Sequence, residues 1–231
     1  MVRVFISDII KKDENSRVGL PDTAKLIYDR LPKTIKARVD NAKNENIKLS
    51  RISVYGLLSE ALFRMYGIRE FELSTNQYGK PYLCDSPLKI NLSHTDGVCV
   101  AAISDGVEIG VDVEGKIDDA REGRLKPRFF SEVNLDDVKQ IDGIEYFLFG
   151  YTPDGELCEA KSSFNVTRGF SGKMDFTRLW TLSEAIMKCD GRGFAALTEI
   201  VKIKDTTEAS TVEISNKDKL YSISVVVKKA R

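Results

Sequence analysis

Three features that would place a protein in a specialised class are absent from this 231-residue sequence. It contains no run of about 18 apolar residues, so no transmembrane helix is predicted. Its first stretch turns polar without a long apolar segment, so we expect no secretory signal and a cytoplasmic location. No two of the four cysteines form a CxxC pair, which argues against a zinc ribbon and against a disulfide scaffold; they are Cys84, Cys99, Cys158 and Cys189.

The net charge is zero, from 35 basic and 35 acidic residues, but the charges are unevenly spread. Basic residues exceed acidic ones in residues 1–90, whereas acidic residues exceed basic ones in residues 91–200. Such a division suits a site that holds a cation and a polyanion together. Chance scatter on a solvated surface is the alternative. Basic residues are not concentrated beside aromatic ones, so nucleic-acid binding is not expected.

Composition and hydrophobic periodicity predict an α+β fold. Hydrophobic residues make up 42% of the chain, enough for a core, and the length suits one large domain or two small ones. We predict helices over 22–31, 33–66, 121–139 (interrupted near Pro127) and 177–190, and strands over 2–10, 71–74, 88–94, 98–104, 107–114, 199–204, 211–215 and 220–228. Turn residues predict hairpins at 104–106 and within 144–166.

Two carboxylates stand two residues apart in a predicted strand with the sequence GVDVE. Residues two apart on a strand point to the same face, so Asp112 and Glu114 lie side by side. Their charges repel unless a cation lies between them, and Mg²⁺ is a natural occupant of an all-oxygen site. The pattern thus indicates a metal site, although an exposed strand with a polar face is the more common reason for it.

A second pair of charges lies on the helix predicted at 177–190. Glu184 and Lys188 are four residues apart and share one face with Trp180, the sole tryptophan. An ordinary surface ion pair would have the same spacing. The tryptophan favours a partly buried setting, in which the carboxylate completes a metal site or acts as a base and the lysine neutralises a phosphate.

Two further segments carry polar groups at a turn and at a strand end. His94, the sole histidine, follows Ser93 at the end of a predicted strand, where a hydroxyl, an imidazole and backbone amides can face one phosphate. Lys80 stands in a Gly-Lys-Pro turn. Taken one by one, these residues are more often a structural histidine and a solvated lysine.

Taken together and in this order, five motifs resemble those of the Sfp-type 4'-phosphopantetheinyl transferase family. They are GKP (79–81), NLSHTDG (91–97), GVDVE (110–114), RFFSEV (128–133) and WTLSEAIMK (180–188). The resemblance implies two similar α+β subdomains related by a pseudo-two-fold axis in one chain. We expect them at 1–115 and 116–231, with a hairpin inserted near 140–176. The resemblance also implies coenzyme A and Mg²⁺ bound between the subdomains, and it favours a monomer.

The activity implied by the resemblance is transfer of 4'-phosphopantetheine from coenzyme A to a serine of an apo acyl or peptidyl carrier protein, releasing adenosine 3',5'-bisphosphate. Asp112, Glu114 and Glu184 match the magnesium ligands of the family. Glu184 also matches the proposed base for the carrier serine, and Lys188 matches the lysine beside the coenzyme A phosphates. The expected catalytic residues are therefore Glu184, Lys188 and Asp112. Direct and water-relayed removal of the serine proton both stay open.

The remaining matches concern coenzyme A binding. Ser93 and His94 match the pair near the pyrophosphate and the 3'-phosphate, and Lys80 matches a lysine that contacts the nucleotide. Arg51 is the candidate for an arginine that reaches the 3'-phosphate. Lys33 and Lys36 are weaker candidates, because their region has no clear motif.

Two departures from the family pattern bear on these expectations. Ser183 stands where family members carry lysine; it lies about 100° around the helix from Glu184, so it cannot replace Lys188 and we expect only a supporting contact to be lost. The segment between Ser131 and Trp180 is long, so we expect the hairpin near 144–166 to influence the choice of carrier protein. Two alternative functions are a coenzyme A-binding module without transfer and a metal-dependent phosphohydrolase.

Overall fold

The computed structural model describes residues 1–12, 20–129, 135, 138–159, 164–168, 175–216 and 218–229. Its strands form two larger sheets and one small one. The first sheet has the strand order β4 (Lys89–Thr95), β5 (Val98–Ser104), β1 (Val2–Asp8), β7 (Ile144–Tyr151) and β8 (Leu157–Glu159). The pairing of β1 with β7 is parallel and the other pairings are antiparallel, so this sheet is mixed.

The second sheet is antiparallel throughout. Its order is β6 (Ile109–Gly115), β11 (Lys219–Lys228), β10 (Thr207–Asn216) and β9 (Phe164–Arg168). A separate two-stranded ribbon consists of β2 (Leu73–Thr75) and β3 (Pro81–Leu83), which flank the turn that carries Lys80. The predicted α+β class is therefore confirmed.

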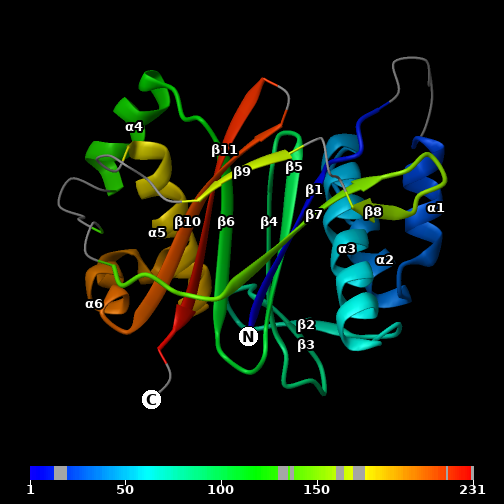
Figure 1. The fold of residues 1–231 in the computed structure, drawn as a ribbon, viewed down its shortest axis with the longest axis horizontal. Coiled ribbons are helices and arrows are strands. Elements are labelled where there is room, and N and C mark those ends of the chain that lie inside the picture. Colours follow the sequence, from blue (N-terminus) through cyan, green and yellow to red (C-terminus); the bar gives the residue numbers. More distant parts are fainter. Residues whose placement is uncertain are drawn as a thin grey trace.

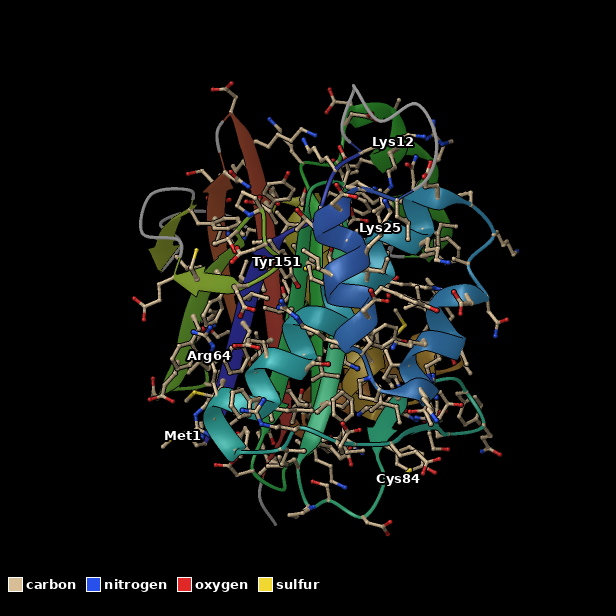
Figure 2. All side chains as sticks on the ribbon, turned by 90° about the vertical axis from the view of Figure 1, so that its right-hand side faces the viewer. Met1, Lys12, Lys25, Arg64, Cys84 and Tyr151 are labelled. Atoms are coloured by element: carbon tan, nitrogen blue, oxygen red, sulfur yellow. The ribbon has the colours of Figure 1, made fainter. Side chains whose placement is uncertain are left out.

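The helices form the two outer layers of the molecule. On one side lie α1 (Asp22–Arg30), α2 (Lys33–Asp40) and α3 (Glu45–Tyr66); on the other lie α4 (Asp119–Phe129), α5 (Phe176–Asp190), a 3₁₀ turn (Gly193–Glu199) and α6 (Ile200–Lys204) (Figure 1). Figure 2 shows α1 and α3 in front of the strands of the first sheet, with Tyr151 beside them. Tyr151 Oη donates a hydrogen bond to the carbonyl oxygen of Ser53 on α3 at 2.7 Å.

The alternation of side chains along β5 explains why the two sheets stack. Cys99, Ala101 and Ile103 belong to the core beneath α1–α3, while Val98, Val100 and Ala102 belong to the core between the two sheets. All seven residues of this strand are buried. A strand with two apolar faces must be covered on both sides, so the arrangement is four layers deep: helices, first sheet, second sheet, helices.

Most predicted helix ends are confirmed, and the residues that cause them are visible. The helix predicted over 33–66 is divided, because the Asn44 side chain accepts a hydrogen bond from Ile47 N at 2.9 Å and caps α3. Gly67 and Gly191 end α3 and α5 in the left-handed conformation that glycine favours. Of the helix predicted over 121–139, residues 121–129 belong to α4, whereas the other described positions, 135, 138 and 139, are not helical.

Two local predictions are wrong. A turn forms at 104–106, but β5 and β6 do not make a hairpin; they enter different sheets, and their apolar side chains meet in the core between those sheets. Residues 199–204 are helical instead of extended, apart from Glu199, which ends the 3₁₀ turn. Ile200 and Ile203 are both buried against the α5 side, and a three-residue spacing places them on one face of a helix.

The hairpin predicted within 144–166 is present in its described part, where β7 pairs with β8 across a turn closed by Gly155. In the sheet order, β8 lies at the edge opposite β4, so its position gives no support to a role in choosing the carrier protein.

Residues 130–133 of the RFFSEV motif lie outside the described residues. All four cysteines are free thiols. Of the helices in the described ranges, none combines the length and the apolar character needed to cross a membrane.

Candidate functional site

The two sheets meet where the edge strand β4 runs beside the edge strand β6. Asn91 Oδ1 on β4 accepts a hydrogen bond from Val111 N at 2.9 Å, and Ser93 Oγ accepts one from Val113 N at 3.4 Å. Side-chain oxygens thus take the place of backbone carbonyls for the amides of a buried strand edge. Ser93 and Asp112 stand 19 positions apart on two different strands, and this junction brings their side chains into contact.

Asp112, Ser93 and Lys188 form the centre of the site. Lys188 Nζ lies 2.6 Å from Asp112 Oδ1 and 3.1 Å from Ser93 Oγ, and it also approaches the Val111 carbonyl oxygen at 3.3 Å. Ser93 Oγ donates to Asp112 Oδ1 at 2.8 Å. Three residues predicted from separate motifs therefore share one hydrogen-bond network. Lys188 contacts Asp112 directly, so the aspartate is only partly available to a cation.

One oxygen of this network has no partner. Asp112 is only 6% exposed, and its Oδ2 atom is buried without a hydrogen bond in the described structure. Burial raises the pKa of Asp112, while the positive charge of Lys188 opposes that rise. A buried carboxylate oxygen without a partner is costly. A cation or a bound donor at Oδ2 would remove that cost.

Gly110 allows α5 to approach β6 closely enough for this contact. A Cβ atom at position 110 would lie 2.1 Å from the Ala185 carbonyl oxygen and 2.4 Å from Cys189 N. Both are backbone atoms of α5, so no side-chain rotation could relieve the overlap. The glycine of the GVDVE motif is therefore required for the close packing of α5 on β6, and this packing brings Lys188 into contact with Asp112.

Glu114, two residues along β6, has a basic partner that the sequence did not suggest. Arg121 Nη2 lies 2.7 Å from Glu114 Oε1, and the other carboxylate oxygen accepts a hydrogen bond from Thr95 Oγ1 at 3.2 Å. The Arg121 guanidinium also lies over the Trp180 ring, 5.7 Å from its centroid. No periodicity or motif marks Arg121, because only the fold of α4 brings it back to the strand.

Glu184 completes what we call the acidic cluster, defined as Asp112, Glu114 and Glu184. Burial raises the pKa of Glu184 to about 7, with the negative charges of Asp112 and Glu114 adding to the rise and Lys188 opposing it. The three carboxylates are thus close enough for their charges to interact. Within the described residues, however, no three His, Cys, Asp or Glu side chains are arranged so that they could hold a metal ion.

His94 and Arg51 lie beside this network on its α3 side. His94 is exposed at the surface, but the protein around it restricts its hydration and lowers its pKa, and the positive charges of Lys188 and Arg51 lower it further. Arg51 also donates to the Arg38 carbonyl oxygen at 2.6 Å, which holds its guanidinium near the start of α3. Lys188 and Arg51 are therefore close enough for their charges to act on His94, and their positive charge favours an anion near it.

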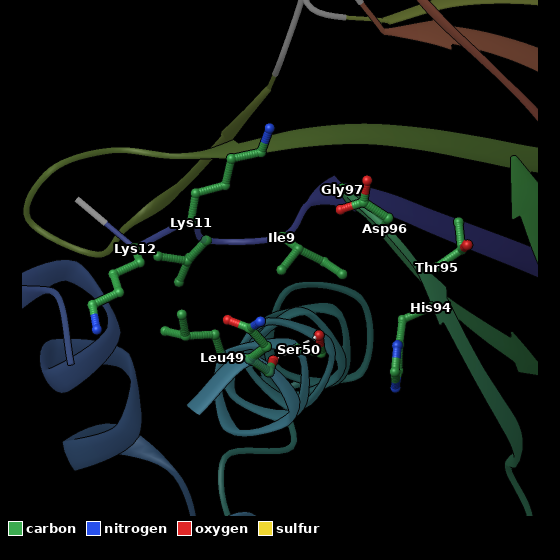
Figure 3. A pocket seen from close by; sticks show the side chains of 11 residues that line it. Ile9, Lys11, Lys12, Leu49, Ser50, His94, Thr95, Asp96 and Gly97 are labelled. Atoms are coloured by element: carbon green, nitrogen blue, oxygen red, sulfur yellow. Dashed lines mark hydrogen bonds between the residues drawn. The ribbon is translucent and has the colours of Figure 1, made fainter. Parts of the chain in front are cut away.

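A cavity of about 500 Å³ opens next to His94 (Figure 3). It lies between the end of β1, the first turns of α3 and the end of β4; its lining residues are Ile9, Ile10, Lys11, Lys12, Asn46, Leu49, Ser50, His94, Thr95, Asp96 and Gly97. Lys12 pairs with Glu45 at 2.7 Å, and Asp96 pairs with Lys219 at 2.6 Å. The site thus consists of a polar network and an adjoining space large enough for part of a nucleotide.

Lys80 is placed differently from the other predicted site residues. Its Nζ lies 2.7 Å from Glu108 Oε2 and 3.0 Å from the Cys189 carbonyl oxygen, so it binds the end of α5. Asn76 holds the same turn in place, because its Nδ2 donates to the Gly191 carbonyl oxygen at 2.8 Å. The ammonium group of Lys80 is therefore engaged in structural contacts at the far end of the helix from Trp180.

Ser183 and the lysines of α2 lie outside the network. Ser183 is fully buried, and its Oγ donates to the Leu179 carbonyl oxygen at 2.7 Å. Its hydroxyl thus satisfies the helix backbone. Lys36 Nζ donates to the Asp29 carbonyl oxygen at 2.8 Å, and Lys33 is exposed.

The sequence motifs therefore identified the network that contains Ser93, Asp112 and Lys188, together with Glu114, Glu184, His94 and Arg51 around it. Sequence reasoning missed Arg121, Thr95 and Asn91. Asn91 belongs to the NLSH motif, so its strand-end position was a usable signal. In comparisons with known proteins, no family model matches this chain and no curated protein matches it significantly.

Proposed function

We propose that this protein is a Mg²⁺-dependent 4'-phosphopantetheinyl transferase of the Sfp type. It would transfer the phosphopantetheine group of coenzyme A to a serine of an apo acyl or peptidyl carrier protein. The observation that carries the proposal is the contact of Ser93, Asp112 and Lys188 within a cluster that also includes Glu114 and Glu184. A phosphate-binding lysine beside several carboxylates suits the transfer of a phosphoryl-linked group.

The residues present fit a magnesium ion. The test is Asp112 Oδ2, a buried carboxylate oxygen that has no partner and would gain one from a cation. Mg²⁺ is commonly held by one or two carboxylates together with substrate phosphates, so three converging ligands are not required beforehand. Asp112, Glu114 and Glu184 would hold the ion, which would offset the charge that develops on the diphosphate.

Different basic residues would then bind different phosphates of coenzyme A. Lys188 and Ser93 would bind the diphosphate, because they already share hydrogen bonds at the centre of the site. His94 and Arg51 would bind the 3'-phosphate, beside the cavity of about 500 Å³. Lys80 would meet the nucleotide from the turn docked on the end of α5. Its salt bridge to Glu108 would have to loosen for that contact.

Glu184 is the proposed acceptor of the carrier serine proton. A base is most effective when its pKa lies near the working pH, and in the protein without a metal ion burial raises the pKa of Glu184 to about 7. A bound Mg²⁺ would lower this pKa, so the proton would pass to Glu184 either directly or through a water. The serine oxygen would form a bond to the phosphorus that carries pantetheine. The bond from that phosphorus to the bridging oxygen would break, and adenosine 3',5'-bisphosphate would leave.

The chain connectivity supports the proposal of two similar subdomains. In the first half, β1 and α3 precede the paired strands β4 and β5, and the sheet order is β4-β5-β1. In the second half, β6 and α5 precede the paired strands β10 and β11, and the order is β10-β11-β6. The pairing favours a boundary just before β6, whereas the sequence led us to expect it after residue 115.

The decisive experiment is modification of a carrier protein followed by mass spectrometry. Incubation with coenzyme A, Mg²⁺ and an apo carrier should add one phosphopantetheine group to the carrier. Glu184→Gln should slow this reaction by about 10²–10⁴-fold, while Glu70→Gln, a change at an exposed glutamate, should not slow it.

Three results would contradict the proposal. Coenzyme A binding without modification of several unrelated carriers would indicate a binding module. Release of a nucleotide in the absence of any carrier would indicate a phosphohydrolase. Full activity of Glu184→Gln would remove Glu184 from the mechanism.

A further inference from the structure

Arg121 reaches the acidic cluster from α4, outside the two sheets. Its contacts are the Glu114 carboxylate at 2.7 Å and the face of the Trp180 ring. Its backbone is fixed in the first turn of the helix, where Arg121 N donates to Asp118 Oδ1 at 2.7 Å. The side chain itself is 39% exposed, so it can move away from Glu114 while α4 stays folded.

The two strand carboxylates of the cluster have different basic partners. Asp112 binds Lys188 in a setting where the aspartate side chain is 8% exposed, whereas Arg121 and Glu114 meet nearer the solvent. Both oxygens of Glu114 are in use, one by Arg121 and the other by Thr95. A cation that binds Glu114 must therefore replace at least one of these contacts, and positive charge on Arg121 opposes its approach.

We propose that Arg121 is an internal counter-ion that competes with the divalent cation for Glu114 and moves off Glu114 when the cation binds. The inference rests on the proposed function only in taking the acidic cluster as a cation site. It accounts for the observation that the described carboxylates do not converge as metal ligands while Arg121 holds Glu114. This competition lowers the affinity for the cation, and the Arg121 side chain moves while the backbone of α4 stays in place.

The sole tryptophan provides a direct readout of this movement. Because the guanidinium lies over the Trp180 ring, its departure changes the surroundings of the only indole in the chain. The experiment is a titration of the purified protein with MgCl₂, without coenzyme A or carrier protein, against KCl of equal ionic strength. Tryptophan fluorescence reports the movement, and calorimetry reports the affinity.

We expect Mg²⁺ to change the tryptophan emission of the unmodified protein. In Arg121→Gln the emission should differ before any Mg²⁺ is added, and Mg²⁺ should change it little further. The dissociation constant for Mg²⁺ should fall about fivefold, which is the scale of a partly exposed ion pair. Arg121→Lys keeps the charge without the planar group, so its affinity should be close to that of the unmodified protein and its emission change smaller.

Arg124→Gln is the matched control, because Arg124 is an exposed arginine on the same helix. It should reproduce the unmodified protein in both measurements, and circular dichroism should show that all variants are folded. An unchanged or weaker Mg²⁺ affinity in Arg121→Gln overturns the inference, even where carrier modification succeeds. Tighter binding without carrier modification supports the inference and contradicts the transferase. Absence of Mg²⁺ binding in both proteins overturns the inference but not the transferase, because the phosphates of coenzyme A would supply further ligands during transfer.

Discussion

Helices α3 and α5 each carry a lysine that pairs with an aspartate, and the two pairs differ mainly in burial. Lys48 Nζ lies 2.8 Å from Asp40 Oδ1, and Lys188 Nζ lies 2.6 Å from Asp112 Oδ1. The Asp40 side chain is 49% exposed, whereas that of Asp112 is 8% exposed. The first pair remains in water and contributes little to stability, while the second supplies a buried carboxylate with its partner.

The strand beneath each helix causes this difference. Helix α3 covers β1 and β5, whose facing residues such as Phe5 and Ala101 are apolar. Helix α5 lies against the backbone of β6 at Gly110, and the same strand offers Asp112 two residues later. Similar helices with similar caps thus acquire different chemistry, because one packs on an apolar surface and the other on a polar strand edge.

The largest expected effect tests the two ion pairs directly. Lys188→Met should lower the free energy of unfolding by about 3–5 kcal/mol at pH 7, because it leaves Asp112 buried without its positive partner. Lys48→Met should lower it by no more than about 1 kcal/mol. Urea denaturation measures both values. Adding Asp112→Asn to Lys188→Met should recover part of the loss, and equal losses in the two lysine variants would contradict the comparison.

A smaller effect on stability is expected when alanine replaces either of two closely packed glycines, Gly110 beneath α5 and Gly56 on α3. Gly110→Ala should cost about 2–3 kcal/mol, because the new Cβ would overlap the α5 backbone. At Gly56 on α3 a Cβ would meet only side-chain atoms of Ile27 and Tyr151, at 2.6 and 2.9 Å, which can rotate. Alanine also favours helix by about 0.5–1 kcal/mol over glycine, so Gly56→Ala should cost less. Thermal unfolding would rank the two, and the reverse order would contradict this account.

The smallest effect concerns His94, which lies between the α3 and α5 sides of the site. Its pKa is lowered below the ordinary value of 6.5, so the folded protein binds the proton less readily than the unfolded chain. The contribution of His94 to stability is therefore complete above pH 6.5 and decreases as the pH falls below 6.5. Proton NMR can follow this titration without ambiguity, because the chain has one histidine.

Adenosine 3',5'-bisphosphate should raise the pKa of His94, because a bound phosphate favours the imidazolium form. The urea-unfolded protein supplies the reference value, and His94→Gln removes the signal. A pKa in the folded protein at or above that of the unfolded chain would contradict the restricted hydration of His94 and its proximity to Lys188 and Arg51. A pKa that the nucleotide leaves unchanged would argue against His94 as a phosphate ligand.

Local signals in the sequence were sufficient for much of the secondary structure. The 15 residues of α5 were predicted to within one residue at its start, because Gly191 and the spacing of apolar residues are local features. The same reasoning failed for 199–204, where the β-branched residues Ile200, Val201 and Ile203 favour a strand, although Ile200 and Ile203 also fit one face of a short helix. It also failed to separate β5 from β6, since a turn sequence does not determine whether the strands that it joins pair with each other.

The sequence by itself determined the α+β class, the caps of the main helices and the residue types of the site. Local propensity, capping and a recognisable order of motifs are all properties of neighbouring residues. Only the tertiary structure decided that β4 and β6 meet at one edge, that Lys188 pairs with Asp112, and that Arg121 turns back to Glu114. These contacts join residues from 7 to 76 positions apart. They depend on how two sheets and their helices pack, which no local pattern specifies.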